Sequence, residues 1–89
     1  MTQKTVRIQN ESGLHARAAA KLVRLCEKFK SDVKLFRGRM TANAKSIMGV
    51  MMLAAERGMS LRIVVRGPDA AKALAEIVRL IDDKFGEGK

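Results

Sequence analysis

Strands are indicated where apolar and polar residues alternate along the chain. Near the start, Val6 and Ile8 alternate with polar neighbours, which is the two-residue period of a strand with one buried face. The same alternation recurs twice further on, and Gly38 interrupts one occurrence where a hairpin turn favours a residue that tolerates positive φ. The sequence predicts strands over residues 4–9, a hairpin of two short strands between 33 and 41, and a strand over 61–66.

Helices are indicated where apolar residues recur three and four positions apart. A helix is predicted over 16–29, with one apolar stripe and a basic opposite face. The stripe comprises Ala19, Leu22, Val23, Cys26 and Phe29, and the basic face Arg17, Lys21, Arg24 and Lys28. A last helix follows Gly67-Pro68-Asp69, and its apolar face comprises Ala71, Leu74, Ile77, Val78, Ile81 and Phe85. It is expected to fade into a polar tail over 86–89.

A middle helix is predicted over 47–55, and it contains no charged residue. Ser46 stands directly before it, where a hydroxyl accepts a hydrogen bond from a free N–H of the first turn. In a domain this small we expect Val50, Leu53 and Ala54 to face inward, which leaves an apolar patch outside. The expected patch consists of Ile47, Met48 and Met51.

The order of these elements is strand, helix, strand, strand, helix, strand, helix. We therefore predict an α+β fold, an open two-layer sandwich with helices on one face of the sheet, in a single domain spanning 1–89. No signal peptide or membrane span is recognisable, and the single cysteine, Cys26, is expected to pack in the core. A cytoplasmic protein without membrane insertion is expected.

The charge of the chain is strongly positive and unevenly distributed. Lys and Arg number 18 against 9 Asp and Glu, and the net charge is +9. Residues 1–45 hold 11 basic and 3 acidic side chains, whereas residues 46–89 hold 7 and 6. Such a surface favours an acidic partner, either nucleic acid or an acidic protein face. A small nucleic-acid-binding domain remains an alternative, but Tyr and Trp are absent and the three Phe are expected in the core, so stacking partners for bases are lacking.

His15, the only histidine, lies immediately before the first predicted helix. Gly13 permits unusual backbone geometry there, and the N–H groups of Ala16 and Arg17 have no acceptor within the helix. Together with the Arg17 guanidinium they predict an anion site beside the imidazole. The positive end of the helix and Arg17 favour a neutral ring, and a neutral imidazole can attack a phosphoryl group to form a phosphohistidine. The spacing supports neither a metal site nor a Ser-His-Asp triad, and no cofactor is predicted.

Two segments carry a resemblance to a known family. Ser12-Gly13-Leu14-His15-Ala16-Arg17-Ala18-Ala19 resembles the active-site signature of the HPr phosphocarriers of the bacterial sugar phosphotransferase system. The segment 43–51 resembles the regulatory-serine segment of the same family, with Ser46 at the serine position. The resemblance implies a four-stranded antiparallel sheet covered by three helices. It also implies a carrier and not an enzyme.

The resemblance further implies how the carrier works. Enzyme I, charged by phosphoenolpyruvate, would pass a phosphoryl group to Nδ1 of His15, and an enzyme IIA would take it. An HPr kinase/phosphorylase is a possible partner at Ser46. A regulatory module of an incomplete or nitrogen-related phosphotransferase system is the alternative within the family. One departure is Ala18, where the family usually has proline, a residue that the first turn of a helix tolerates.

A docking surface is expected beside the histidine, with flexible Met side chains that suit several partners. A basic rim of Arg17, Lys21, Arg24 and Lys45 would border the apolar patch, and the protein is expected to be a monomer. The residues expected to dock enzyme I and enzyme IIA are Ala20, Lys21, Arg24, Lys45, Ile47, Met48 and Met51.

Overall fold

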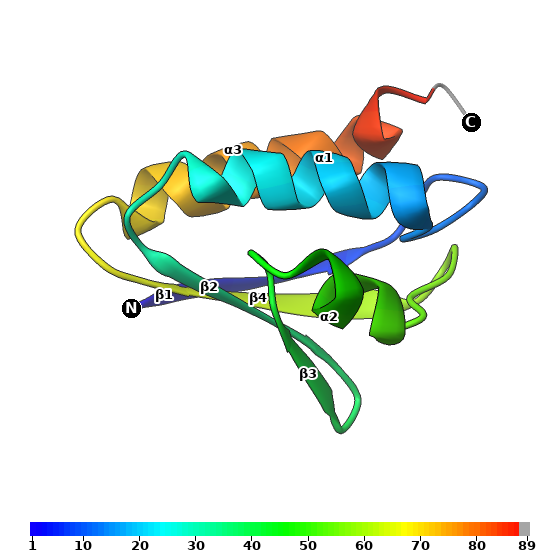
Figure 1. The fold of residues 1–89 in the computed structure, drawn as a ribbon, viewed down its shortest axis with the longest axis horizontal. Coiled ribbons are helices and arrows are strands. Elements are labelled where there is room, and N and C mark those ends of the chain that lie inside the picture. Colours follow the sequence, from blue (N-terminus) through cyan, green and yellow to red (C-terminus); the bar gives the residue numbers. More distant parts are fainter. Residues whose placement is uncertain (88–89) are drawn as a thin grey trace.

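The computed structural model describes residues 1–87 and contains one antiparallel sheet whose strands lie in the order β1-β4-β2-β3. Three α-helices cover one face of this sheet (Figure 1), so the predicted two-layer α+β architecture is confirmed. The strands are β1 (Thr2–Arg7), β2 (Asp32–Arg37), β3 (Met40–Asn43) and β4 (Ser60–Arg66). The helices are α1 (Ala16–Glu27), α2 (Ile47–Met52) and α3 (Ala70–Asp82), followed by the short 3-10 helix η1 (Lys84–Gly86).

The strand register places the predicted apolar positions on the helix side of the sheet. Val6 of β1 lies opposite Leu61 of β4, and Leu35 of β2 lies opposite Ile63. All four side chains are buried, because the two-residue period directs them to the same face. The hairpin between β2 and β3 turns at Gly38, whose φ is +59°, in agreement with the prediction.

The core is closed by the apolar stripes of α1 and α3. Leu22 and Cys26 of α1 and Ile77 and Ile81 of α3 are fully buried. Burial raises the pKa of the Cys26 thiol to about 12, so this side chain stays neutral and serves packing, as predicted. Ala71 was expected on the buried face but is exposed. Helix α3 begins at Ala70, directly after Gly67-Pro68-Asp69 as predicted, and its buried face contains Ala70 and Ala73 instead.

Several element ends differ from the predicted ones. Strand β1 covers Thr2–Arg7 and not 4–9, although pairing continues through Ile8, whose N–H donates to the Met59 carbonyl at 3.0 Å. Helix α1 ends at Glu27 and not at 29, because Lys28 and Phe29 donate to carbonyls three residues back in a tighter final turn. Strand β4 begins at Ser60, one residue before the predicted start.

Helix α2 ends at Met52 and not at 55, because carbonyl groups after Met52 accept hydrogen bonds from other segments of the chain. Arg37 Nε donates to the Leu53 carbonyl at 2.5 Å, and Leu14 N–H donates to the Ala55 carbonyl at 2.9 Å. Between them, Ala54 adopts a φ of +50°. Ala54 is therefore exposed and not inward-facing as predicted, whereas Leu53 and Ala55 are buried.

The chain after α3 turns back over the helices. Lys84 and Phe85 have φ values of +54° and +56°, which end the regular helix, so Phe85 does not lie on a continuous α3 face as expected. Its ring is fully buried nevertheless. The polar tail predicted over 86–89 is described as far as Glu87, and residues 88–89 lie outside the described part.

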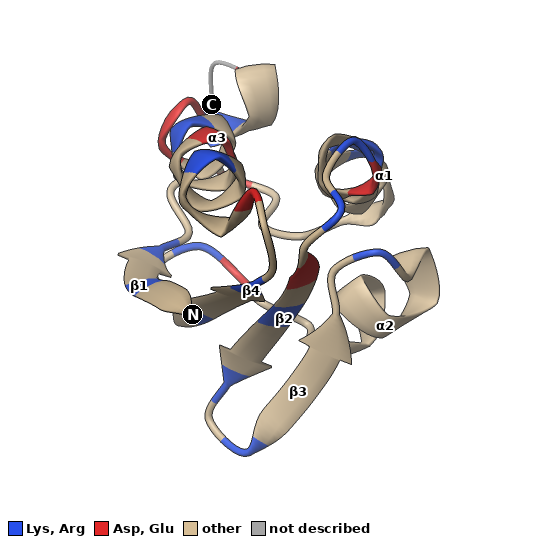
Figure 2. Ribbon diagram, turned by 90° about the vertical axis from the view of Figure 1, so that its left-hand side faces the viewer, with Lys and Arg blue, Asp and Glu red and all other residues tan. Residues whose placement is uncertain are grey.

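Among residues 1–87, no helix covers the second face of the sheet. Figure 2 shows α1, α2 and α3 on one side, with Lys and Arg residues on β2, β4 and the β2–β3 turn. Within residues 1–87, no helix is long and apolar enough to cross a membrane.

Candidate functional site

His15 is the N-cap of α1, the position that the sequence predicted. Its backbone is extended, with φ −76° and ψ 179°, and helical geometry begins at Ala16. The N–H of Arg17 donates to Nδ1 of the His15 ring at 3.3 Å. Nδ1 therefore faces the first turn of the helix and acts as a hydrogen-bond acceptor. The side chain is 32% exposed, so the ring is accessible from solvent.

The loop before His15 is held against the end of α2 by close backbone contact. Gly13 has a φ of +64°, and a Cβ at this position would lie 2.5 Å from the Ala55 carbonyl oxygen. The next residue, Leu14, donates its N–H to that same oxygen. Only glycine fits this approach, and the contact fixes the direction in which the chain enters α1.

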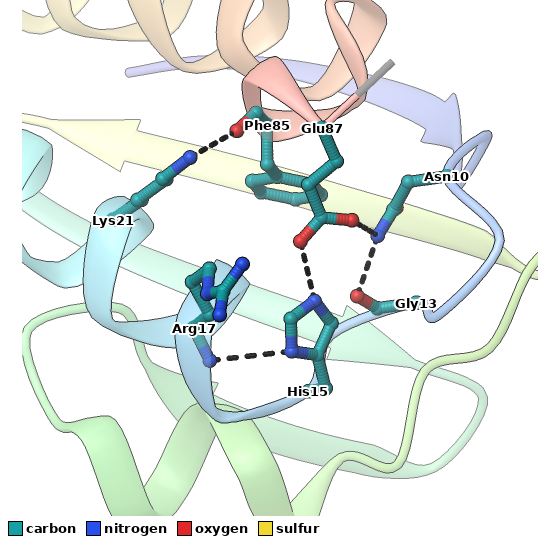
Figure 3. A network of polar contacts seen from close by, with 7 residues as sticks. All are labelled: Asn10, Gly13, His15, Arg17, Lys21, Phe85 and Glu87. Carbon is teal, nitrogen blue, oxygen red and sulfur yellow. Dashed lines mark hydrogen bonds and ion pairs between the residues drawn. The ribbon is translucent and has the colours of Figure 1, made fainter. Parts of the chain in front are cut away.

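The second nitrogen of the ring contacts a carboxylate from the far end of the chain. Nε2 of His15 lies 2.5 Å from Oε2 of Glu87, which is 72 residues away in sequence (Figure 3). The other carboxylate oxygen, Oε1, accepts a hydrogen bond from Asn10 Nδ2 at 3.1 Å. Asn10 is buried, and its Nδ2 also donates to the Gly13 carbonyl at 2.8 Å. The loop, the imidazole and the C-terminal segment thus form one polar network.

The C-terminal segment is held to α1 at a second point. Nζ of Lys21 donates to the Phe85 carbonyl at 2.6 Å, six residues along the chain from His15. The Phe85 ring is fully buried in the core, which also holds this segment in place. These contacts place Glu87 beside the imidazole, with only 14% of its side chain exposed.

The hydrogen bonds assign the tautomer of His15. Because Nδ1 accepts from the Arg17 N–H, the proton of the neutral ring lies on Nε2 and is donated to Glu87. Burial tends to raise the pKa of Glu87, but hydrogen bonds from Asn10 and His15 and the positive charge of Lys21 outweigh it and lower that pKa. Glu87 is thus a carboxylate that fixes the ring with Nδ1 unprotonated.

An open depression of about 530 Å³ adjoins the ring, lined by Glu11, Ser12, His15, Arg17, Lys21, Gly86 and Glu87. The Arg17 guanidinium is exposed and makes no hydrogen bond within residues 1–87. It is thus available to an incoming anion. The amide groups of Ala16 and Arg17 belong to the first turn of α1, where backbone N–H groups lack intrahelical acceptors.

Ser46 caps α2 as predicted, but it does not lie beside His15. Its Oγ accepts a hydrogen bond from the Gly49 N–H at 3.1 Å. Lys45 Nζ donates to the Phe29 carbonyl beyond the end of α1, whereas the start of α1 contacts the end of α2. The two helices therefore run antiparallel. His15 and Ser46 therefore lie at opposite ends of the pair.

The predicted apolar patch is exposed on α2. Ile47 is 45% exposed, Met48 73% and Met51 42%, and Met52, which was not predicted, adds a further exposed side chain. Of the basic rim, Arg17 and Arg24 are exposed. Lys21 and Lys45 are half-buried and hydrogen-bonded to carbonyls. Ala20 is also half-buried.

Glu87 and Asn10 are site residues that sequence reasoning missed. Glu87 lay in a segment interpreted as a polar tail, and no local pattern links it to a residue so far away. Asn10 directly precedes the signature segment but matches no hydrogen-bonding motif on its own.

Comparison with known proteins agrees with this geometry. The family model described as "PTS HPr component phosphorylation site" matches residues 2–83. The phosphocarrier protein HPr of Treponema pallidum is 49% identical over 98% of this chain and 99% of its own length. That of Cupriavidus necator is 47% identical over 100% of both chains. A phosphocarrier protein NPr from Shewanella violacea is 39% identical over 96% of this chain and 93% of its own.

Solved structures agree with the fold as well. The crystal structure of an HPr from Thermoanaerobacter tengcongensis aligns with a TM-score of 0.94 at 40% identity, over 98% of both chains. A structure of an HPr dimer from the same organism aligns with a TM-score of 0.78 at 40% identity, over 98% of this chain and 100% of that one. The monomer expected from the sequence therefore stays a prediction. The match of sequence along the whole length, together with a histidine at the entrance of α1, shows that this chain belongs to the HPr family of phosphocarriers.

Proposed function

We propose that this protein carries phosphoryl groups in a phosphotransferase system, with Nδ1 of His15 as the atom that accepts and donates them. The observation that best supports this function is that the two nitrogens of the His15 ring make different contacts. Nε2 contacts Glu87, while Nδ1 accepts the N–H of Arg17 in the first turn of α1. The exposed Arg17 guanidinium has no hydrogen-bond partner among residues 1–87. A phosphoryl group on Nδ1 would thus lie where an anion is best stabilised.

Acceptance of the group then needs little rearrangement. The Nδ1 lone pair attacks phosphorus, the bond between phosphorus and the donor atom breaks, and its electron pair stays with the donor. The Arg17 N–H, which donates to Nδ1 in this structure, is freed for a phosphate oxygen. The Arg17 guanidinium adds a charge-assisted contact to the same group.

Delivery reverses these steps, and Glu87 contributes to it. The proton on Nε2 remains in place throughout, so the phosphorylated ring carries a positive charge next to the Glu87 carboxylate. When the next acceptor attacks phosphorus, the leaving group is a neutral imidazole and not an anionic one. The carboxylate thus keeps His15 in the form that both accepts and releases the group.

We infer that enzyme I, charged by phosphoenolpyruvate, is the donor and that an enzyme IIA is the acceptor. The exposed apolar side chains of Ile47, Met48 and Met51 on α2 and the exposed Arg24 on α1 would supply a surface suited to both. A cytoplasmic location belongs to the same proposal, because phosphoenolpyruvate is produced there. The regulatory alternative uses the same His15 chemistry and differs only in the protein that reads the phosphorylated form.

Ser46 is proposed as a second phosphorylation site that controls docking. A phosphate there would add about two negative charges at the start of α2, far from His15 but next to Met48 and Ile47. It would disturb the docking surface and not the chemistry. An HPr kinase/phosphorylase is the partner that such a site requires.

Incubation with phosphoenolpyruvate and enzyme I tests the assignment. We expect acid-labile phosphate on the protein and none on a His15→Ala variant that retains its melting temperature. Label on the variant at an unchanged rate would overturn the role of His15. A well-characterised HPr in the same reaction confirms that enzyme I is active.

A further inference from the structure

The helix-free face of the sheet contains a depression that takes no part in the phosphoryl chemistry. Its volume is about 360 Å³, within the range of about 300 to 1,000 Å³ typical of small-molecule sites. Side chains of β1, β2 and β4 line it, among them Gln3, Asp32, Lys34, Phe36, Arg62 and Arg66. It lies on the sheet face opposite the three helices, where Figure 2 shows basic residues on β2 and β4.

The lining is positively charged and poorly neutralised. The lining contains three cationic side chains, those of Lys34, Arg62 and Arg66, and one carboxylate, that of Asp32. Asp32 and Arg66 are partners in the β2–β4 register, yet no ion pair joins them within the described residues 1–87. Lys34 is opposite Val64, next to Arg66 on the same face, so these two cations are diagonal neighbours. Such a pair suits an anion with several oxygens, as a phosphate chain has.

The same depression contains a flat platform. The Arg62 guanidinium carbon lies 4.4 Å from the centroid of the Phe36 ring. Its Nη1 also donates to Oε1 of Gln3 at 3.1 Å, which limits rotation of the guanidinium. A guanidinium held over an aromatic ring offers a plane on which a nucleobase can stack. Phe36 is thus not in the core, where the sequence predicts it, but half-buried on this open face.

We propose that this depression binds a nucleotide, at a site separate from His15. The phosphates would contact Lys34 and Arg66, the base would stack on the Arg62–Phe36 platform, and Asp32 would accept hydrogen bonds from ribose hydroxyls. A free nucleotide fits better than a nucleic-acid strand, because the platform is a single pair in one bounded depression, whereas strands need successive stacking positions.

Amide chemical shifts of the full-length protein, recorded during titration with ATP, test the site. We expect saturable changes confined to β1, β2 and β4, around Gln3, Phe36, Arg62 and Arg66. Arg62→Lys keeps the charge but removes the stacking plane, and it should weaken ATP binding at least about fivefold. Lys34→Gln should weaken it as well. Lys72→Gln removes the same charge from an exposed position on α3 and should leave affinity unchanged.

Several results would overturn the proposal. Tripolyphosphate binding as tightly as ATP would show that charge alone is recognised. Equal weakening by Lys72→Gln and Lys34→Gln would show the same. Shifts confined to His15 and Arg17 would place the anion at the phosphoryl site. Tighter binding of a single-stranded hexanucleotide on this face would make a strand the ligand. Enzyme I should phosphorylate Arg62→Lys and Lys34→Gln at the normal rate. The result of the ATP titration is therefore independent of the proposed carrier function.

Discussion

Replacing Glu87 with glutamine removes one negative charge beside the imidazole and preserves the shape of the side chain. In the protein, Glu87 accepts from Nε2 of His15 through Oε2 and from Asn10 through Oε1. Glutamine can still accept at one position, but its amide nitrogen must face one of the two donors. The variant therefore loses both the carboxylate that stabilises the positively charged phosphorylated ring and one hydrogen bond of the network.

The size of the effect follows from the contacts. A hydrogen bond to a charged group contributes about 1.5 to 3 kcal/mol, and the contact lies near the surface, so the lower end of that range applies. A loss of about 1.4 kcal/mol in the phosphorylated state corresponds to a tenfold change in the equilibrium of transfer. We expect Glu87→Gln to shift the equilibrium between phospho-enzyme I and the carrier toward enzyme I by about tenfold.

Quench-flow measurement of both transfer directions with labelled phosphate gives this equilibrium. Glu27→Gln removes the same charge from an exposed position at the far end of α1 and is the matched control. If Glu87→Gln changed the equilibrium no more than Glu27→Gln does, the carboxylate would have no part in carrying the phosphoryl group.

The pH dependence of the same contact has a definite sign. The pKa of Glu87 is lowered in the folded protein below its ordinary 4.5, so the stability contributed by the contact is present above that value. It is lost as the pH falls through the folded pKa, when the carboxyl is protonated. The difference in melting temperature between wild type and Glu87→Gln should thus be full near pH 6 and disappear in strong acid. A difference that grew as the pH fell would contradict the assignment.

Three further substitutions test other parts of the account. Arg17→Ala should slow both transfer steps at least about tenfold in single-turnover kinetics, because a charge-assisted contact to the phosphoryl group is lost. Rates within twofold of wild type would show that Arg17 does not belong to the site. Ala18→Pro should change the free energy of unfolding by no more than about 1 kcal/mol, because no acceptor for the Ala18 N–H is found within residues 1–87. Denaturant titrations measure this change, and a larger loss would mean that the fold needs the Ala18 N–H. Ser46→Asp should weaken binding to enzyme I, more at low salt than at high salt, with little change in melting temperature. Ser46→Asn, which also caps α2, should bind enzyme I normally. Equal binding by both variants would contradict a role of charge at Ser46 in docking.

Local chemistry made the entrance of α1 predictable from sequence. His15, Arg17 and the first-turn amides are neighbours in the chain, and a residue before an apolar stripe marks where free N–H groups lie. The Ser46 cap was predictable for the same reason, and its Oγ bonds to Gly49 as expected. The alternation of apolar residues likewise sufficed for the sheet, since each strand buries one face.

Contacts between distant segments were not predictable in this way. The end of α2 depends on Arg37 and Leu14, which capture the Leu53 and Ala55 carbonyls from other elements. Glu87 reaches His15 only because the chain reverses at Lys84 and Phe85, where positive φ values occur at residues that do not signal them. Their positions directly before apolar runs placed His15 and Ser46 correctly at the starts of their helices. Those positions could not show that the two helices run antiparallel and separate these residues.

The proposed function requires that Nδ1, and not Nε2, of His15 carries the phosphoryl group. Selective ¹⁵N labelling of the imidazole, followed by phosphorylation with phosphoenolpyruvate and enzyme I, resolves the two nitrogens by long-range NMR correlation. We predict phosphorus coupling to Nδ1 while Nε2 keeps its proton beside Glu87. Phosphorus coupled to Nε2, with Nδ1 protonated, would contradict it.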